Sequence, residues 1–110
     1  MAMEAIGAER ALAERDRIVA QLQEQAPRLR ARGISRLSLF GSMARAEAGP
    51  KSDLDLLIEV DPHSPYSLFD LVDLQDHLHG LLGRPIHFAV ASKLRPWLRR
   101  EILAEAISIF

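Results

Sequence analysis

Residues 34–60 of this 110-residue sequence read ISRLSLFGSMARAEAGPKSDLDLLIEV, and this stretch decides the fold. Residues 34–40 and 54–60 are apolar segments of strand length, and polar residues are interspersed along both of them. The first segment ends at Gly41-Ser42, a pair that is typical of a turn from a strand into a helix. The stretch therefore predicts two strands with a turn after the first.

The flanking sequence predicts helices and one further strand. Apolar residues recur at helical spacing before residue 30, but Pro27 predicts a break near residue 25 and a second short helix that stops at Gly33. The other predicted elements are a short helix at residues 42–46, a turn at Gly49-Pro50, a leucine-rich helix at residues 68–82, a strand at residues 86–90 and a helix from residue 96 to about residue 106. Residues 107–110 are too few to decide whether a last strand follows.

Length and composition limit the classes of protein to which the chain can belong. A chain of 110 residues supports one domain, in which we expect residues 1–33 to form a helical segment and residues 34–110 the core. Apolar residues make up 48% and charged residues 26%, which is ordinary for a folded domain and excludes intrinsic disorder. The chain contains no cysteine, so disulfides, thiolate metal sites and a cysteine nucleophile are excluded.

Charge and hydropathy argue against membranes and nucleic acid. The 14 basic and 15 acidic residues give a net charge of −1, so any bound anion must be held by local groups. No apolar run approaches the roughly 18 residues of a membrane span, and the first residues carry acids where a signal peptide would be apolar. We therefore expect a cytoplasmic protein without direct nucleic-acid or membrane contacts.

Two acids, Asp53 and Asp55, lie at the start of the second strand. Residues two apart on a strand point to the same face, with Cα atoms about 6–7 Å apart. Carboxylates this close repel each other, and a divalent cation shared with substrate phosphates would offset the repulsion. Asp-x-Asp alone is also common as a pair of exposed acids at a turn, so this pattern by itself leaves both interpretations open.

Gly41, Ser42 and Arg45 are candidates for holding a phosphate. A glycine lets a phosphate approach the backbone, and Ser42 offers an N–H and a hydroxyl where a helix begins. Arg45 follows three residues later on the same side of that helix and either turns to the phosphate or lies in solvent. In isolation, Ser42 is better explained as a helix N-cap.

The joint pattern is more specific than its parts. The segments LFGSMAR (residues 39–45) and SDLDLLIE (residues 52–59) resemble the minimal nucleotidyltransferases, small prokaryotic members of the superfamily related to DNA polymerase beta. The resemblance covers nearly all of the chain and implies an α+β fold in which helices back a small mixed sheet. It also implies that Gly41 and Ser42 grip the triphosphate of ATP, with Arg45 as a further candidate.

The same resemblance assigns metal ligands. Asp53 and Asp55 match the first two of three acids that hold two Mg²⁺ or Mn²⁺ ions in the family. The third acid normally lies on the strand after Gly83-Arg84-Pro85, where this chain has His87. A neutral imidazole is a poor ligand for a hard cation, although His87 can still serve as a general base or a weak third ligand. The resemblance thus implies catalysis by Asp53, Asp55 and His87, and the substitution of His87 for the third acid leaves open whether the transfer is impaired.

The family resemblance also implies a partner. Many minimal nucleotidyltransferases look like antitoxins of HEPN-family ribonuclease toxins, to which they transfer a nucleoside monophosphate or which they mask by binding. Two hypotheses follow, a protein adenylyltransferase that uses ATP and a binding module that has kept the fold and lost the transfer. The sequence does not identify the base, the acceptor residue or the oligomeric state.

Other conspicuous residues have ordinary explanations. His77 and His79 do not share a helix face, so we place both at a solvated edge. Trp97 precedes two arginines in a predicted amphipathic helix, where we expect it to be buried with the arginines in solvent.

Overall fold

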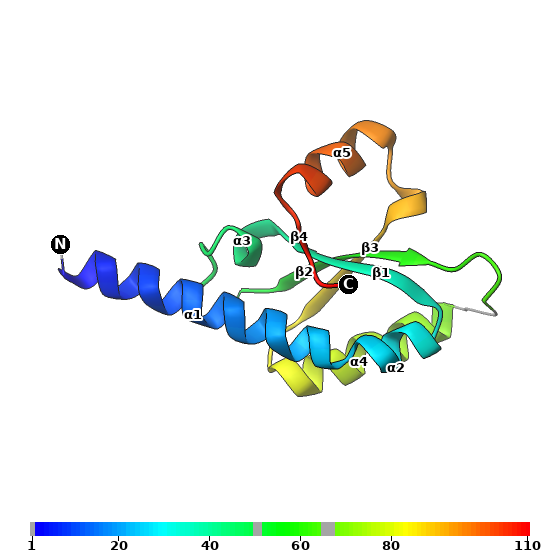
Figure 1. The fold of residues 1–110 in the computed structure, drawn as a ribbon, viewed down its shortest axis with the longest axis horizontal. Helices are drawn as coiled ribbons and strands as arrows, with labels where there is room; N and C mark the ends of the chain where they lie inside the picture. The colour runs from blue at the N-terminus through cyan, green and yellow to red at the C-terminus, as the bar shows by residue number, and fades with distance from the viewer. Residues whose placement is uncertain (1, 50–51, 65–67) are drawn as a thin grey trace.

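The computed structural model describes residues 2–49, 52–64 and 68–110 (Figure 1). Its elements, in chain order, are α1 (Ala2–Glu24), α2 (Ala26–Ala31), β1 (Ile34–Phe40), α3 (Gly41–Ala44), β2 (Leu54–Val60), α4 (Leu68–Leu82), β3 (Ile86–Val90), the 3₁₀ helix η1 (Ala91–Lys93), α5 (Pro96–Glu105) and β4 (Ile107–Ser108). The predicted strands and helices are confirmed, including the helix break before Pro27. Pro50, in the predicted turn, lies outside the described residues.

The four strands form one mixed sheet in the order β3-β2-β1-β4. Strand β1 runs antiparallel to β2 and to β4, whereas β2 and β3 are parallel. The last residues of the chain do form an edge strand: Leu39 pairs with Ile107, and the buried Ile109 donates its N–H to the Leu37 carbonyl at 2.9 Å. The expected α+β fold with a small mixed sheet is confirmed.

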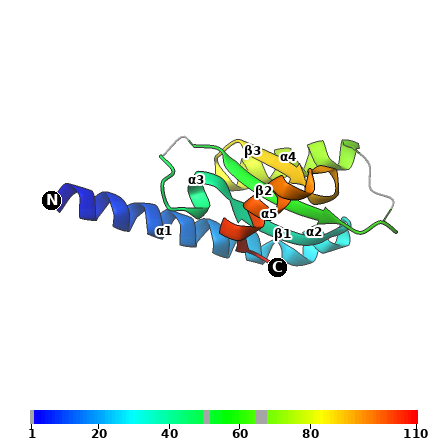
Figure 2. The same ribbon diagram turned by 90° about the horizontal axis from the view of Figure 1, so that it is seen from above.

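Helices cover both faces of the sheet unequally. Figures 1 and 2 show α1, α2 and α4 on one face and α5 on the other, while the N-terminal half of α1 extends beyond the sheet. The main core fills the first of these interfaces and includes Ile18, Leu22, Leu29, Leu37, Leu39, Leu54, Leu56, Ile58, Leu74 and Leu78. Because side chains alternate along a strand, Asp55 faces away from this core. No helix in the described part of the chain is long and apolar enough to cross a membrane.

The prediction that Trp97 is buried is wrong. Its side chain is 53% exposed, and α5 buries none of its described residues. The half-buried residues Leu98 and Ile102 are four apart and mark the side of α5 that faces inward. Trp97 is one position before Leu98, so the helical rotation turns it towards solvent.

His77 also differs from its prediction, whereas His79 is exposed as expected. The His77 side chain is half-buried, and its Nε2 lies 3.1 Å from Gln25 Oε1 and 2.9 Å from Arg28 Nη1. The sequence separates these residues by about fifty positions, so local periodicity carries no sign of the contact. His77 therefore helps to fasten α4 to the junction of α1 and α2.

Candidate functional site

The sheet register places the candidate residues at one end of the three longer strands. Phe40, the last residue of β1, pairs with Asp55 of β2, and Asp55 pairs with His87 of β3. The end of an antiparallel strand lies beside the start of its neighbour, and parallel neighbours start together. Gly41 directly follows Phe40, and Asp53 lies two residues before Asp55, so residues far apart in sequence come together at this end of the sheet.

Gly41 allows the chain to turn tightly against Asp55. Its φ is +75°, in the region where residues with a Cβ are strained. A Cβ on Gly41 would overlap Asp55 Oδ2 and would lie 3.3 Å from Asp55 Cγ. The missing side chain therefore leaves open backbone against a carboxylate oxygen. Ser42 follows in the half-buried first turn of α3.

Asp53 and His87 are joined by a hydrogen bond across the start of β2 and β3. His87 Nε2 lies 2.7 Å from Asp53 Oδ2, and the two side chains are 59% and 48% exposed. This contact occupies one carboxylate oxygen of Asp53 and leaves the other available. The residue at the position where the family resemblance implies a third acid thus contacts Asp53 directly.

The pKa of Asp55 is raised in the fold. Partial burial raises the pKa of Asp55 above its ordinary value, His87 lowers this pKa, and the negative charge of Asp53 raises it. Arg45 lowers the pKa of Asp55 by a smaller effect. The net rise, caused mainly by burial, makes the ionised form of Asp55 less favourable in the fold than in water.

Arg45 is held by two acids. Its guanidinium contacts Glu47 at 2.9 Å and Glu105, at the end of α5, at 3.2 Å. The Arg45 side chain is 43% exposed and is paired with these two acids, so it lies in solvent, one of the two alternatives that its sequence position left. Its charge nevertheless acts on Asp55. A phosphate would have to compete with Glu47 and Glu105 for it.

Comparison with known proteins identifies the family. The sequence model of a protein family, described as "Nucleotidyltransferase domain", matches residues 16–109, which is most of the chain. The chain belongs to the nucleotidyltransferase family. The match spans every candidate residue described above.

Relatives and solved structures agree with this assignment. The nucleotidyltransferase is 37% identical to a Methanocaldococcus jannaschii protein named as a "putative protein adenylyltransferase", over 76% of this chain and 87% of that one. It is 29% identical to the protein adenylyltransferase MntA of Thermococcus cleftensis, over 70% and 76% of the two chains. A solved structure of a "putative minimal nucleotidyltransferase" shares 36% identity and a TM-score of 0.65, with 91% of this chain and 93% of that chain covered.

A more distant structure shares the fold alone. The crystal structure of a toxin–antitoxin with AMP-PNP superimposes with a TM-score of 0.65 at 14% identity, over 80% of this chain and 72% of that one.

The donor set of this nucleotidyltransferase suits a divalent cation. Asp53 and Asp55 supply carboxylate oxygens, the ligands that Mg²⁺ and Mn²⁺ prefer, and the Gly41 turn keeps a side chain away from Asp55 Oδ2. Within the described ranges, no three His, Cys, Asp or Glu side chains are arranged to hold a metal ion. Two carboxylates suit a cation that takes its other ligands from phosphate and water.

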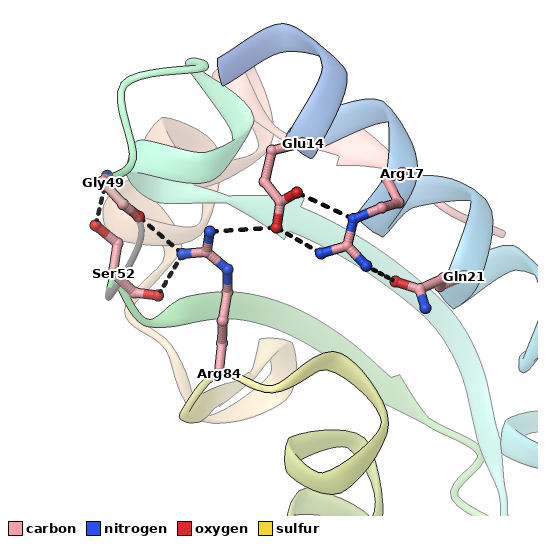
Figure 3. A network of polar contacts seen from close by, with 6 residues as sticks. All are labelled: Glu14, Arg17, Gln21, Gly49, Ser52 and Arg84. Atoms are coloured by element: carbon pink, nitrogen blue, oxygen red, sulfur yellow. Dashed lines mark hydrogen bonds and ion pairs between the residues drawn. The ribbon is translucent and has the colours of Figure 1, made fainter. Parts of the chain in front are cut away.

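Arg84 and Glu14 lie near the site and had no predicted role. Arg84 is 7% exposed; it donates to the Ser52 carbonyl in the loop before Asp53, and it also donates to Glu14 of α1 (Figure 3). An arginine between a glycine and a proline gives no local sign of burial. Only its placement beside the Asp53 loop in the fold shows what it contacts.

Proposed function

We propose that this nucleotidyltransferase binds ATP with Mg²⁺ or Mn²⁺, transfers AMP to a HEPN-family ribonuclease toxin and thereby acts as its antitoxin. The observation that carries the proposal is the close approach of the Gly41 turn to Asp55, with Asp53 beside it at the same end of the sheet. Relatives named as protein adenylyltransferases support the reaction class. Shared folds with toxin–antitoxin structures, including a mutant of MntA–HpeT, fit the antitoxin role.

Each candidate residue has a part in this proposal. The backbone of Gly41 and the N–H and hydroxyl of Ser42 hold the triphosphate, while Asp53 and Asp55 ligate the cation. The cation, when bound, neutralises phosphate charge and aligns the triphosphate. Arg45 exchanges its contacts with Glu47 and Glu105 for one with a phosphate.

The transfer itself needs a base for the acceptor hydroxyl. The hydroxyl oxygen forms a bond to the α-phosphorus of ATP, and the bond to the bridging oxygen of the β-phosphate breaks, which releases pyrophosphate. With His87 Nε2–H donated to Asp53, the lone pair on Nδ1 accepts the proton from the hydroxyl. Asp53 thereby orients His87 while its second oxygen remains available to the cation.

A second candidate function is a binding module that masks the toxin without transfer. It is favoured by His87, because the site offers two carboxylates where the family has three. Two carboxylates neutralise one divalent cation, so a second ion would lack a protein anion. In this case complex formation alone neutralises the toxin.

Label transfer from [α-³²P]ATP tests the enzyme. Candidate acceptors are products of neighbouring genes that carry an Arg-x-x-x-x-His motif. We expect a labelled acceptor with Mg²⁺ or Mn²⁺, no label with Asp55→Asn, and more label with His87→Asp, which restores a third carboxylate. Asp16→Asn is the matched control, because Asp16 is exposed on α1 and its carboxylate pairs with the neighbouring Arg15, away from the candidate site. Absence of label under every divalent cation would contradict the transfer.

Neutralisation in cells separates the two functions. The double variant Asp53→Ala/Asp55→Ala removes both carboxylates and leaves the helical surfaces intact. If transfer is required, this variant folds and binds the toxin but no longer protects cells from it. Full protection by the double variant would instead establish the binding module.

A further inference from the structure

Arg84 connects three segments that are far apart in the sequence. It lies just before β3, and its Nη1 donates to the Gly49 carbonyl at 2.8 Å and to the Ser52 carbonyl at 3.1 Å (Figure 3). Its Nη2 donates to Glu14 Oε1 of α1 at 3.2 Å. The side chain is 7% exposed, so water competes little for these donors. A single buried guanidinium therefore ties the loop between α3 and β2 to α1.

Glu14 is itself fixed in place. Arg17 donates to both of its carboxylate oxygens, at 2.6 and 3.0 Å, and also to Gln21 at 3.0 Å. The hydrogen bond from Arg17 lowers the pKa of Glu14 against the effect of burial, and Arg84 lowers it further. Glu14 is thus a charged and oriented partner for Arg84 at neutral pH.

Contacts of Arg84 and of the residues after it bracket Asp53. On one side of Asp53, Arg84 holds the Ser52 carbonyl; on the other side, the Leu54 N–H donates to the Pro85 carbonyl at 2.9 Å. The Asp53 carboxylate itself meets His87 at 2.7 Å. The peptide units before and after Asp53, and its side chain, are therefore all held by the segment 84–87.

We propose that Arg84 is a positioning residue that sets the Asp53 carboxylate for cation binding through the Ser52 peptide. The proposal rests on the proposed function in one respect, which is that Asp53 is a cation ligand. Asp53 precedes β2, so the sheet ladder does not fix its backbone by itself. The buried guanidinium supplies the missing restraint, much as outer-shell groups orient metal ligands elsewhere.

Two variants separate positioning from general stabilisation. Arg84→Gln removes the charge and shortens the donor, so it loses the Ser52 and Glu14 contacts. Arg84→Lys places one ammonium where Nη1 stood, so it can bond both carbonyls and gives up only the Glu14 contact. Arg36→Gln is the matched control, because Arg36 is an exposed arginine of β1 whose ion pair with Glu59 lies away from Asp53.

The first measurement is amide hydrogen exchange of the protein without metal or nucleotide. We expect the Leu54 amide to exchange at least about tenfold faster in Arg84→Gln, with partial recovery in Arg84→Lys, while core amides of β1 stay protected. The second measurement is titration with Mn²⁺ alone. We expect affinity to fall about tenfold in Arg84→Gln, recover in part in Arg84→Lys and stay unchanged in Arg36→Gln.

The outcomes distinguish this proposal from the proposed function. Unchanged Leu54 exchange and Mn²⁺ affinity in folded Arg84→Gln would overturn the positioning role, as would a uniform rise in exchange across the sheet. If Arg84→Gln does not fold, Arg84→Lys alone decides: because it keeps the bond to the Ser52 carbonyl, a full loss of about tenfold in Leu54 protection and in Mn²⁺ affinity in Arg84→Lys would overturn the positioning role. A wild-type protein that binds no Mn²⁺ refutes the proposed cation site, while the exchange measurement still tests the restraint.

Discussion

Replacing Gly41 with alanine perturbs the turn that brings the backbone against Asp55. Two costs follow from the geometry. At φ +75° an alanine is strained by roughly 1–2 kcal/mol. The new Cβ would also overlap Asp55 Oδ2 and crowd Cγ at 3.3 Å and Cβ at 3.4 Å. The carboxylate tip can rotate away, so strain dominates the loss of stability and the displaced carboxylate dominates the loss of binding.

Urea unfolding and Mn²⁺ titration measure these two effects separately. We expect Gly41→Ala to lower the free energy of unfolding by about 1–2 kcal/mol, which corresponds to a fall in Tm of roughly 5–10 °C. We expect Mn²⁺ affinity to fall at least about tenfold, because a cation ligand is displaced. Gly80→Ala is the control: Gly80 lies within α4 with no atom within 4 Å of an added Cβ, so this change stabilises by about 1 kcal/mol.

A Gly41→Ala variant with unchanged stability and unchanged Mn²⁺ affinity would contradict both the strain at Gly41 and the role of Asp55 as a cation ligand. Loss of stability with full Mn²⁺ affinity would show that the turn is strained but that Asp55 is not a ligand.

The structure makes three further predictions. Asp55→Asn abolishes Mn²⁺ binding but raises the urea midpoint of the metal-free protein at pH 7, because the raised pKa of Asp55 makes its ionisation unfavourable in the fold. This gain in stability disappears as the pH falls below the ordinary carboxyl pKa of about 3.9. A gain that persists at that pH would show that the ionisation of Asp55 is not its cause. Arg45→Gln weakens ATP binding in calorimetry with little change in the urea midpoint, since its ion pairs with Glu47 and Glu105 are exposed; unchanged ATP affinity would remove Arg45 from the site. Trp97→Ala, at an exposed position, costs less than about 1 kcal/mol in urea unfolding, and a loss of about 3–5 kcal/mol would mean that the residue is buried after all.

Local sequence patterns were sufficient to predict the helices and strands, and the motifs in residues 39–45 and 52–59 were sufficient to select the candidate site residues. The alternation in residues 34–40 and 54–60 and the spacing of apolar residues depend on nearest neighbours along the chain, and these elements appear where predicted. The mixed sheet was implied by the family resemblance. The register that pairs Asp55 with both Phe40 and His87 is seen only in the structure, because strand direction alone does not determine it.

Contacts between distant segments were beyond the reach of periodicity. Arg45 meets Glu105 across sixty positions, and Arg84 meets Glu14 across seventy. The prediction that Trp97 is buried failed for a related reason. A pattern shows that a helix is amphipathic but not how closely it packs, and α5 buries none of its described residues. Such contacts depend on tertiary placement, which single residues do not encode.

We propose above that the Gly41-Ser42 turn, Asp53 and Asp55 form one site for a divalent cation and the triphosphate of a nucleotide. Paramagnetic line broadening by Mn²⁺, in NMR spectra recorded with a non-hydrolysable ATP analogue, tests this claim most directly. We expect substoichiometric Mn²⁺ to broaden the amide signals of Gly41, Ser42, Asp53 and Asp55 before those of α4. Broadening centred elsewhere, or none at stoichiometric Mn²⁺, would contradict it.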